Sequence, residues 1–279
     1  MTVPFLGSAA TSSRVLTSHS LRSRFRALYP DVYLPPDAEV TATTRARAAW
    51  LWSRCRGVLA GRSAAALHGA RWVDGRLPAQ LLWENRHRPG GIETWSDAIP
   101  DDEITRIEGM AVTTPARTAL DIASREPFGS AVAALDALAR ATRLDMADVK
   151  RLAQRYPGRR GIRQARRVVD MVDPGAESPP ETWLRLLFIR AGFPRPTTQI
   201  PVHNDYGVLI AVIDLGWDDV KIGADYDGAH HWMDRRRFTE DIRRAENINE
   251  QGWIHLRVTA HDVEGDILRR TRAAFARRT

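Results

Sequence analysis

The chain has 279 residues, 43% of them hydrophobic, and a formal net charge of +7. At about 100–200 residues per domain this length predicts two domains. No run of roughly 18 uncharged apolar residues predicts a membrane span, the N-terminus lacks the pattern of a signal peptide, and the single cysteine, Cys55, excludes an internal disulfide and a cysteine-based zinc site. We therefore expect a cytoplasmic protein with no membrane partner.

The first third of the chain predicts short basic elements. Residues 1–40 suggest a helix near Leu21–Leu28 and a strand at Val32–Leu34, which the following proline pair ends. Thr41–Arg54 has the pattern of a helix. Ser63 is placed as the N-cap of a further helix, Ala64–His68.

The middle of the chain changes from strands to helices. Residues 71–114 contain short apolar runs between turn residues, which predicts β-structure. Pro115 stands at the first position of an expected helix, and amphipathic helices continue to residue 172, with a break at Pro157. Basic residues crowd the last of them, and Arg159, Arg160 and Arg163 are our candidates for phosphate contact. The same pattern also fits a solvated helix face.

A basic balance favours a polyanionic partner, and arginine supplies nearly all of the positive charge here. Lysine occurs only at Lys150 and Lys221. Codon usage in a genome rich in G and C explains the same skew, so the charge alone leaves both explanations open.

A turn-rich linker at 173–180 separates the two predicted domains, 1–172 and 173–279. After it come a helix capped by Ser178, with Pro179 at its first position, two apolar strands joined by a tight turn, a long polar helix, and a strand with period two around Ile254. The order predicts a mixed α/β (α+β) domain.

Two aspartates mark the predicted hairpin of the second domain. Asp214 ends one apolar strand and Asp225 lies in the next, while Glu181 opens the helix before them. An acidic side chain in an apolar strand is costly unless it is paired, hydrogen-bonded or bound to metal. Carboxylate oxygens suit Mg²⁺ or Mn²⁺, and such an ion polarises a phosphodiester and activates water. We therefore predict a metal site at Asp214, Asp225 and Glu181.

Together these residues resemble the Vsr-like branch of the PD-(D/E)XK (restriction-endonuclease-like) nucleases. The markers follow the order of that pattern over about 90 residues: Glu181, Asp214, Asp225, Asp227, His231, Asp241, Arg244, Gly252 and Trp253. The resemblance implies a metal-dependent DNA endonuclease, in which Arg244 stabilises the scissile phosphate.

The chain departs from the pattern at one catalytic position. Asp227 occupies the place where the superfamily has a lysine, so Lys221 or His231 is expected to activate the attacking water. Structural explanations stay open beside these roles. Glu181 fits a capping box with Ser178, and Asp225 fits a structural ion pair with Arg244.

The first 172 residues resemble the AbiEi-like antitoxins of type IV toxin–antitoxin systems. The resemblance rests on LTSHSLRSRFRALYPDVYLP, GVLAGRSAAALHGARW and GMAVTTPARTALDIAS. It implies a DNA-binding winged helix-turn-helix within residues 1–60. Arg22, Arg24 and Arg26 are the candidate phosphate contacts of that module.

The main hypothesis is a Mg²⁺- or Mn²⁺-dependent endonuclease that its N-terminal region brings to DNA, and double-strand cutting would favour a homodimer. The alternative is a non-catalytic DNA-binding protein such as an antitoxin-like transcriptional repressor. A third is a nuclease fold reused to bind a protein, without nucleic acid. Metal-dependent cleavage distinguishes the first, and a steep loss of affinity with salt distinguishes the second from the third.

Overall fold

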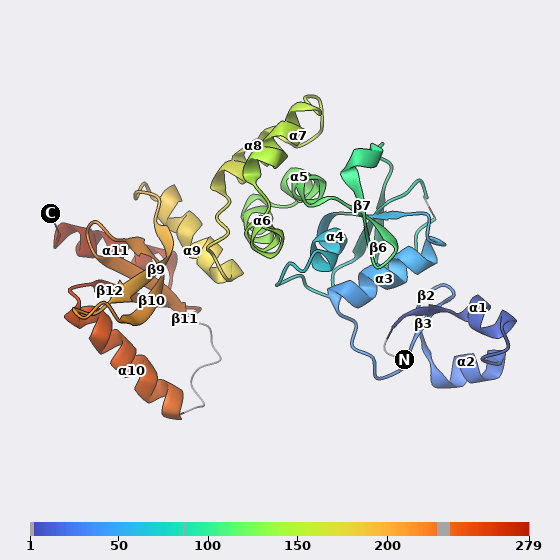
Figure 1. Ribbon diagram of the computed structural model, residues 1–279, viewed down its shortest axis with the longest axis horizontal. Helices are drawn as coiled ribbons and strands as arrows, with labels where there is room; N and C mark the ends of the chain where they lie inside the picture. Colours follow the sequence, from blue (N-terminus) through green and yellow to red (C-terminus); the bar gives the residue numbers. More distant parts are fainter. Residues whose placement is uncertain (1–2, 86, 228–234, 279) are drawn as a thin grey trace. The chain divides into compact units, whose positions relative to one another are not determined.

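The computed structural model describes residues 3–85, 87–227 and 235–278 (Figure 1). The chain divides into two compact units, Met1–Pro174 (unit 1) and Gly175–Thr279 (unit 2). The described residues form helices and three separate sheets, which confirms the mixed α/β class. Across these ranges, no helix combines the length and the apolar character that a membrane crossing requires.

Unit 1 begins with two short helices and a small sheet. The sheet has the order β1-β3-β2, and the elements are β1 (Phe5–Leu6), α1 (Gly7–Ser12), α2 (Ser18–Arg24), β2 (Arg26–Tyr29) and β3 (Val32–Leu34). The strand at Val32–Leu34 matches the prediction. Strands β2 and β3 form an antiparallel hairpin, so the chain runs helix, turn, helix, hairpin.

The predicted helix near Leu21–Leu28 is wrong in its second half. Helix α2 starts earlier, because Thr17 caps it by accepting the backbone N–H of Ser20, and it ends at Arg24. Phe25 is extended, and its ring packs edge-on against Phe5 with 5.1 Å between centroids. This aromatic contact and the pairing of β2 with β3 override the local helical pattern.

A five-stranded sheet of order β6-β5-β4-β8-β7 forms the centre of unit 1. It confirms the β-rich stretch at 71–114. Its strands and the adjacent helices are β4 (Val58–Leu59), β5 (Ala79–Leu82), β6 (Ile92–Trp95), β7 (Ile104–Ile107), β8 (Met110–Thr113), α3 (Ala42–Trp52) and α4 (Gly61–Leu67). Ser63 is not the N-cap of α4, because the helix begins at Gly61 after Ala60. The Ser63 hydroxyl instead accepts the backbone N–H of Gln80 in β5, at 2.9 Å.

Four helices complete unit 1, and they lie at the end of the unit away from α1 and α2 (Figure 1). They are α5 (Pro115–Arg125), α6 (Phe128–Thr142), α7 (Met146–Gln154) and α8 (Ile162–Met171). The break that Pro157 predicts between the last two helices is present. Helix α5 packs against the other three, and its Arg117 side chain is buried with 1% exposure.

Unit 2 is a four-stranded sheet with helices. Strand order is β12-β11-β10-β9, and β12 runs parallel to β11 while the other pairs are antiparallel. The elements are α9 (Pro179–Arg190), β9 (Thr197–His203), β10 (Leu209–Trp217), β11 (Ile222–Asp227), α10 (Arg235–Glu250), β12 (Ile254–Thr259) and α11 (Glu264–Ala276). The predicted order of helix, hairpin, helix and strand is present, while β9 and α11 were not predicted.

Two apolar clusters hold the sheet of unit 2. One joins α9 and α11 to the strands through residues such as Leu184, Leu215 and Ile267. The other joins α10 to β9 and β10 through Ile248, Ile200 and Ile213. Because each helix is tied to the sheet by buried side chains, the polar residues at the centre of β10 and β11 are held in fixed positions.

Candidate functional site

Asp214 and Asp225 lie side by side on neighbouring strands. The hairpin pairs Leu215 with Ala224, which makes the two aspartates adjacent in the antiparallel register. The backbone N–H of Asp214 donates to Asp225 Oδ1 at 2.9 Å, and the N–H of Tyr226 donates to Asp214 Oδ2 at 3.1 Å. The hairpin therefore brings together the two predicted carboxylates.

Glu181 has a capping role and also belongs to the same acidic cluster. Its Oε1 accepts from the Ser178 hydroxyl at 2.7 Å, and its Oε2 accepts from the backbone N–H of Glu177 at 2.8 Å. Glu181 is buried, with 8% of the residue's surface exposed. Its charge adds to the repulsion that Asp214 experiences. The capping explanation for Glu181 is thus confirmed, and its role as a metal ligand stays a prediction.

The environment separates the two aspartates electrostatically. Burial, and then the charges of Asp225 and Glu181, raise the pKa of Asp214 to about 7. Burial also opposes ionisation of Asp225, but His255 and Arg244 outweigh it, so the pKa of Asp225 lies below its usual range. Near neutral pH Asp225 is therefore ionised while Asp214 is only partly ionised, because two close carboxylates resist carrying their charges together.

Two basic side chains contact Asp225 Oδ2. Arg244 Nη1 of α10 lies 2.7 Å away, and His255 Nε2 of β12 lies 3.1 Å away. Arg244 also donates to the carbonyl of Val212 at 2.5 Å. The ion pair between Asp225 and Arg244 that sequence left open is present.

His255 was not among the predicted site residues. It is buried, with 5% side-chain exposure, and it lies on the strand that pairs in parallel with β11. The sequence carried one signal, because His255 alternates with the apolar residues Ile254 and Leu256. Only the parallel pairing of β12 with β11, however, places the His255 side chain next to Asp225.

Lys221 is not at this site. It lies in the turn between β10 and β11, with φ of +48°, and its Nζ donates to the carbonyl of Gln251 at 3.1 Å. Four residues of strand, at about 3.3 Å each, separate it from Asp225 along β11. Asp227, in the position of the usual lysine, pairs with Arg257 at 2.6 Å. His231 lies outside the described residues.

The basic candidates of unit 1 differ in their surroundings. Arg22 and Arg24 are exposed on α2, and Arg26 is exposed on β2 with Nη2 donating to the carbonyl of Ala38 at 3.0 Å. Arg160 and Arg163 are exposed at the start of α8. Arg159 is different: its side chain is 9% exposed and pairs with the buried Asp121. It is part of the interior and is not on the exposed basic face.

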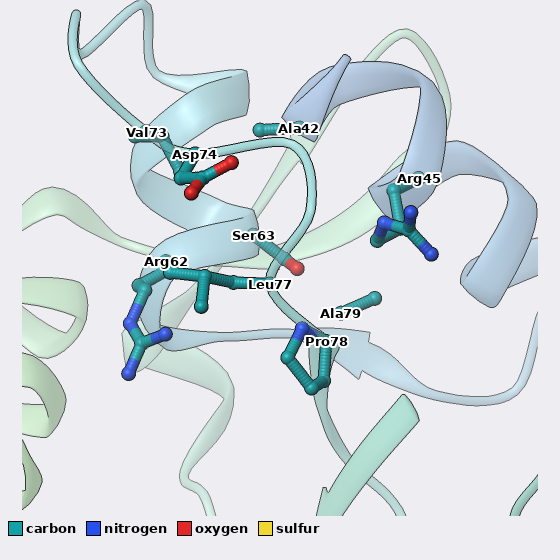
Figure 2. A pocket seen from close by; sticks show the side chains of 9 residues that line it. All are labelled: Ala42, Arg45, Arg62, Ser63, Val73, Asp74, Leu77, Pro78 and Ala79. Atoms are coloured by element: carbon teal, nitrogen blue, oxygen red, sulfur yellow. The ribbon is translucent and has the colours of Figure 1, made fainter. Parts of the chain in front are cut away.

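A small pocket of unit 1 lies between α3, α4 and the loop before β5. Figure 2 shows Arg45 and Arg62 on either side of Pro78. Arg45 Nε donates to the carbonyl of Gly75 at 2.6 Å, and Arg62 pairs with Glu126. The pocket holds about 10 Å³, roughly the space of one water. It is therefore too small for a ligand.

Comparison with known proteins places one segment of unit 1. Residues 57–172 match the AbiEi antitoxin C-terminal domain. Uncharacterized proteins of Mycobacterium tuberculosis strains CDC 1551 and H37Rv are each 31% identical over 160 residues, which is 57% of this chain and 59% of the relative. The aligned segment thus spans less than two thirds of those relatives. No solved structure matches.

The match supports the predicted antitoxin resemblance for the sheet and the helices from α4 to α8. It begins at residue 57 and does not extend over the small N-terminal sheet. The Vsr-like resemblance of unit 2 has no counterpart in these comparisons. Residues 57–172 of this chain are thus similar to the C-terminal domain of an AbiEi antitoxin.

Proposed function

We propose that this protein is a DNA-binding regulator of the antitoxin type, in which unit 1 holds an operator sequence. The observation that carries the proposal is the match of residues 57–172 to the AbiEi antitoxin C-terminal domain. It favours the repressor alternative over the nuclease hypothesis. Unit 1 would contact DNA through elements that precede the matched segment.

The first 34 residues have the order of a helix-turn-helix with a wing. Helix α2 follows α1 after a short turn, and the β2–β3 hairpin follows α2. In such modules the second helix enters the major groove and the wing lies on the backbone. Leu21 of α2 is buried, while Ser18, His19 and Arg22 are exposed. These three side chains would face base edges, and Arg24 and Arg26 would contact phosphates.

The test is binding to the DNA upstream of the protein's own gene, compared with a scrambled duplex, in EDTA. We expect the natural sequence to bind more tightly, and Arg22→Gln/Arg24→Gln to remove that preference. Arg71→Gln/Arg76→Gln is the matched control, because it removes two exposed cations from elsewhere in unit 1. Equal affinity of the wild-type protein for both duplexes would overturn the proposal.

A second function is supported by the acidic cluster of unit 2. Asp214 of β10 and Asp225 of β11 are adjacent, the charge of Glu181 on α9 acts on Asp214, and the pKa of Asp214 is raised to about 7. A divalent cation relieves repulsion of this kind, and the donors are the hard oxygens that Mg²⁺ or Mn²⁺ prefers. Bound there, the ion would supply Lewis-acid chemistry toward a phosphodiester. Asp214 and Glu181 would hold it, with Asp225.

The residues around the aspartates would affect both the binding of the cation and the contact with the phosphate. Arg244 and His255 keep Asp225 ionised through their contacts with Oδ2. An incoming cation must share Asp225 with these two groups, which would weaken its binding. Arg244, at 36% side-chain exposure, is the group at this site that would reach a phosphate. With Lys221 at the turn, no lysine of the described residues lies beside the aspartates.

Cleavage of supercoiled plasmid in Mg²⁺, Mn²⁺ or EDTA tests this second function. Nicking that requires metal, disappears in Asp214→Asn and persists in Asp218→Asn would establish it, because Asp218 is an exposed aspartate of the same hairpin. DNA binding that survives EDTA without any nicking would leave the regulator as the function of the protein.

A further inference from the structure

The outer face of helix α8 carries arginines without acidic partners. Arg163, Arg166 and Arg167 are exposed, and Arg160 is exposed in the turn before the helix. The opposite face is fixed inward, because Ile162, Ala165, Val168 and Val169 are buried. Residues three and four apart share a helix face, so the packing of α8 holds this arginine row outward. We call these four residues the α8 arginine face.

The basic residues of α7 and of the position directly after it are paired, in contrast to the α8 arginine face. On α7, Lys150 pairs with Asp170 at 2.7 Å and Arg151 pairs with Asp148. Arg155 pairs with Asp102 at 2.8 Å. In the part of the chain that the structure describes, Arg160, Arg163 and Arg166 contact no carboxylate, and Arg167 lies over the ring of Phe128 at 5.5 Å.

This arrangement costs the free protein stability. Like charges at helical spacings of three and four residues repel each other and destabilise the helix. The first turn of α8 contains no acidic residue, and Asp170 in its last turn pairs with Lys150 of α7. An excess of arginine codons would add arginines without regard to partners, yet Arg151 of α7 and Arg155 directly after it each have one. A polyanion that lies along α8 would remove the repulsion.

The chemistry of the surroundings favours a nucleic acid over a protein as that polyanion. Protein interfaces centre on buried apolar or aromatic anchors. Among the described residues, no large apolar side chain of α7 or α8 is exposed. A surface of guanidinium groups alone suits phosphates, which arginine binds through paired N–H donors.

We propose that the α8 arginine face binds the phosphate backbone of a nucleic-acid duplex, independently of base sequence. Figure 1 shows α8 at the end of unit 1 away from α1 and α2, so this contact is separate from the operator contact proposed above and does not depend on it. Each arginine that meets a phosphate releases counterions, which makes affinity fall with salt.

The experiment measures binding of a duplex of arbitrary sequence, as DNA and as RNA, over a range of salt concentrations. Variant Arg163→Gln/Arg166→Gln should bind roughly tenfold more weakly, and on DNA its slope of log affinity against log salt should be smaller by about 1.8, or about 0.9 per phosphate contact. The matched control is Lys150→Gln/Arg151→Gln, which removes the same charge from exposed but paired positions of α7. It should leave the slope unchanged.

A second variant distinguishes loss of the positive charge from loss of the folded structure. Arg163→Lys/Arg166→Lys keeps the charge and should keep the slope, and thermal unfolding should match among all variants. A loss on DNA, on RNA or on both identifies which backbone the face accepts. An unchanged slope in Arg163→Gln/Arg166→Gln, an equal loss in the α7 control, or no binding of either duplex by the wild-type protein would overturn the proposal.

The outcome is distinguishable from that of the operator proposal. Operator preference with an unchanged slope in the α8 variant would sustain the operator contact and reject the α8 contact. A slope that depends on the α8 arginines, with no preference between natural and scrambled sequence, would do the reverse.

Discussion

Two clusters of buried charge, one in each unit, have opposite compositions. In unit 1, Arg117 donates to Glu103 at 2.7 Å and to Asp121 at 3.1 Å, and Arg159 contacts Asp121 as well. Two cations thus meet two carboxylates. The hydroxyl of Tyr156 donates to Glu103 at 2.6 Å, and burial together with Glu103 raises the pKa of this tyrosine to about 12.

In unit 2 carboxylates outnumber fixed cations. Asp214 and Asp225 are adjacent and Glu181 acts on Asp214 through its charge, while Arg244 is the permanent cation that contacts Asp225. This difference in charge balance between two buried clusters shows that burial alone does not indicate function. The balanced cluster joins η1 (Asp101–Glu103), α5 and the turn before α8, whereas in the unbalanced cluster the excess negative charge raises the pKa of Asp214.

The largest expected effect is loss of the balance in unit 1. Arg117→Met would leave Glu103 and Asp121 buried with too little positive charge, and we expect a loss of about 3–5 kcal/mol of unfolding free energy. Urea denaturation, with hydrogen exchange of α5 peptides to assign the transition to unit 1, measures it. A loss below about 1 kcal/mol, the ceiling for an exposed pair, would contradict the structural role.

The next-largest effect is expected at Asp225, the carboxylate that Arg244 and His255 contact. Asp225→Asn would leave Arg244 and His255 without a carboxylate, and we expect a loss of about 1–3 kcal/mol. The amide oxygen of the new side chain still accepts the N–H of Asp214, so the hairpin itself should persist. Because the charge of Asp225 helps to raise the pKa of Asp214, that pKa should fall in the variant. Carboxyl titration by NMR checks both expectations, and an unmoved Asp214 would show that the aspartates do not interact.

A smaller effect, with a distinct pH dependence, is expected at Asp214. Its pKa in the folded protein, about 7, lies above its ordinary value of 3.8. The folded state therefore holds the proton more tightly, and this contribution to stability is complete below about pH 4 and is lost as pH rises through about 7. Asp214→Asn removes the loss, so above pH 7 unit 2 should be more stable by roughly 1–2 kcal/mol than the wild type.

Urea denaturation at pH 5 and pH 8 measures the difference, with hydrogen exchange of β10 peptides to assign it to unit 2. Asp218→Asn, in the exposed turn of the same hairpin, keeps Asp214 and should therefore lose stability between pH 5 and pH 8 as the wild type does. A wild-type stability that does not fall between these two values of pH would contradict the raised pKa. Millimolar Mg²⁺ that raises wild-type stability at pH 8, but not that of Asp214→Asn, would add support for a cation site.

The smallest effect is expected at a surface pair. Arg47 contacts Glu108 at 2.7 Å, but their side chains are 29% and 59% exposed. A double-mutant cycle of Arg47→Met and Glu108→Gln should give a coupling below about 1 kcal/mol. A coupling energy as large as that between Arg117 and Glu103 would mean that burial does not make an ion pair of this protein stronger.

Elements with local signals could be predicted from the sequence. Pro115 and Pro179 at first helical positions, Ser178 as a cap and the break at Pro157 each act within a few residues of chain. Asp214 and Asp225 were also accessible from sequence, because a tight hairpin leaves few ways to pair two apolar strands. The resemblance of residues 57–172 to an antitoxin domain belongs to this category too.

Contacts between groups that are distant in sequence could not be predicted and depend on the folded chain. His255 joins Asp225 because β12 pairs in parallel with β11, and a parallel neighbour far along the chain leaves no local sign of its register. Arg159 and Arg163 look alike in sequence, yet one is buried against Asp121 and the other faces outward. Phe25 ends α2 through its contact with Phe5. In each case the free energy comes from a partner that is distant in sequence, and local propensity is too small to outweigh it.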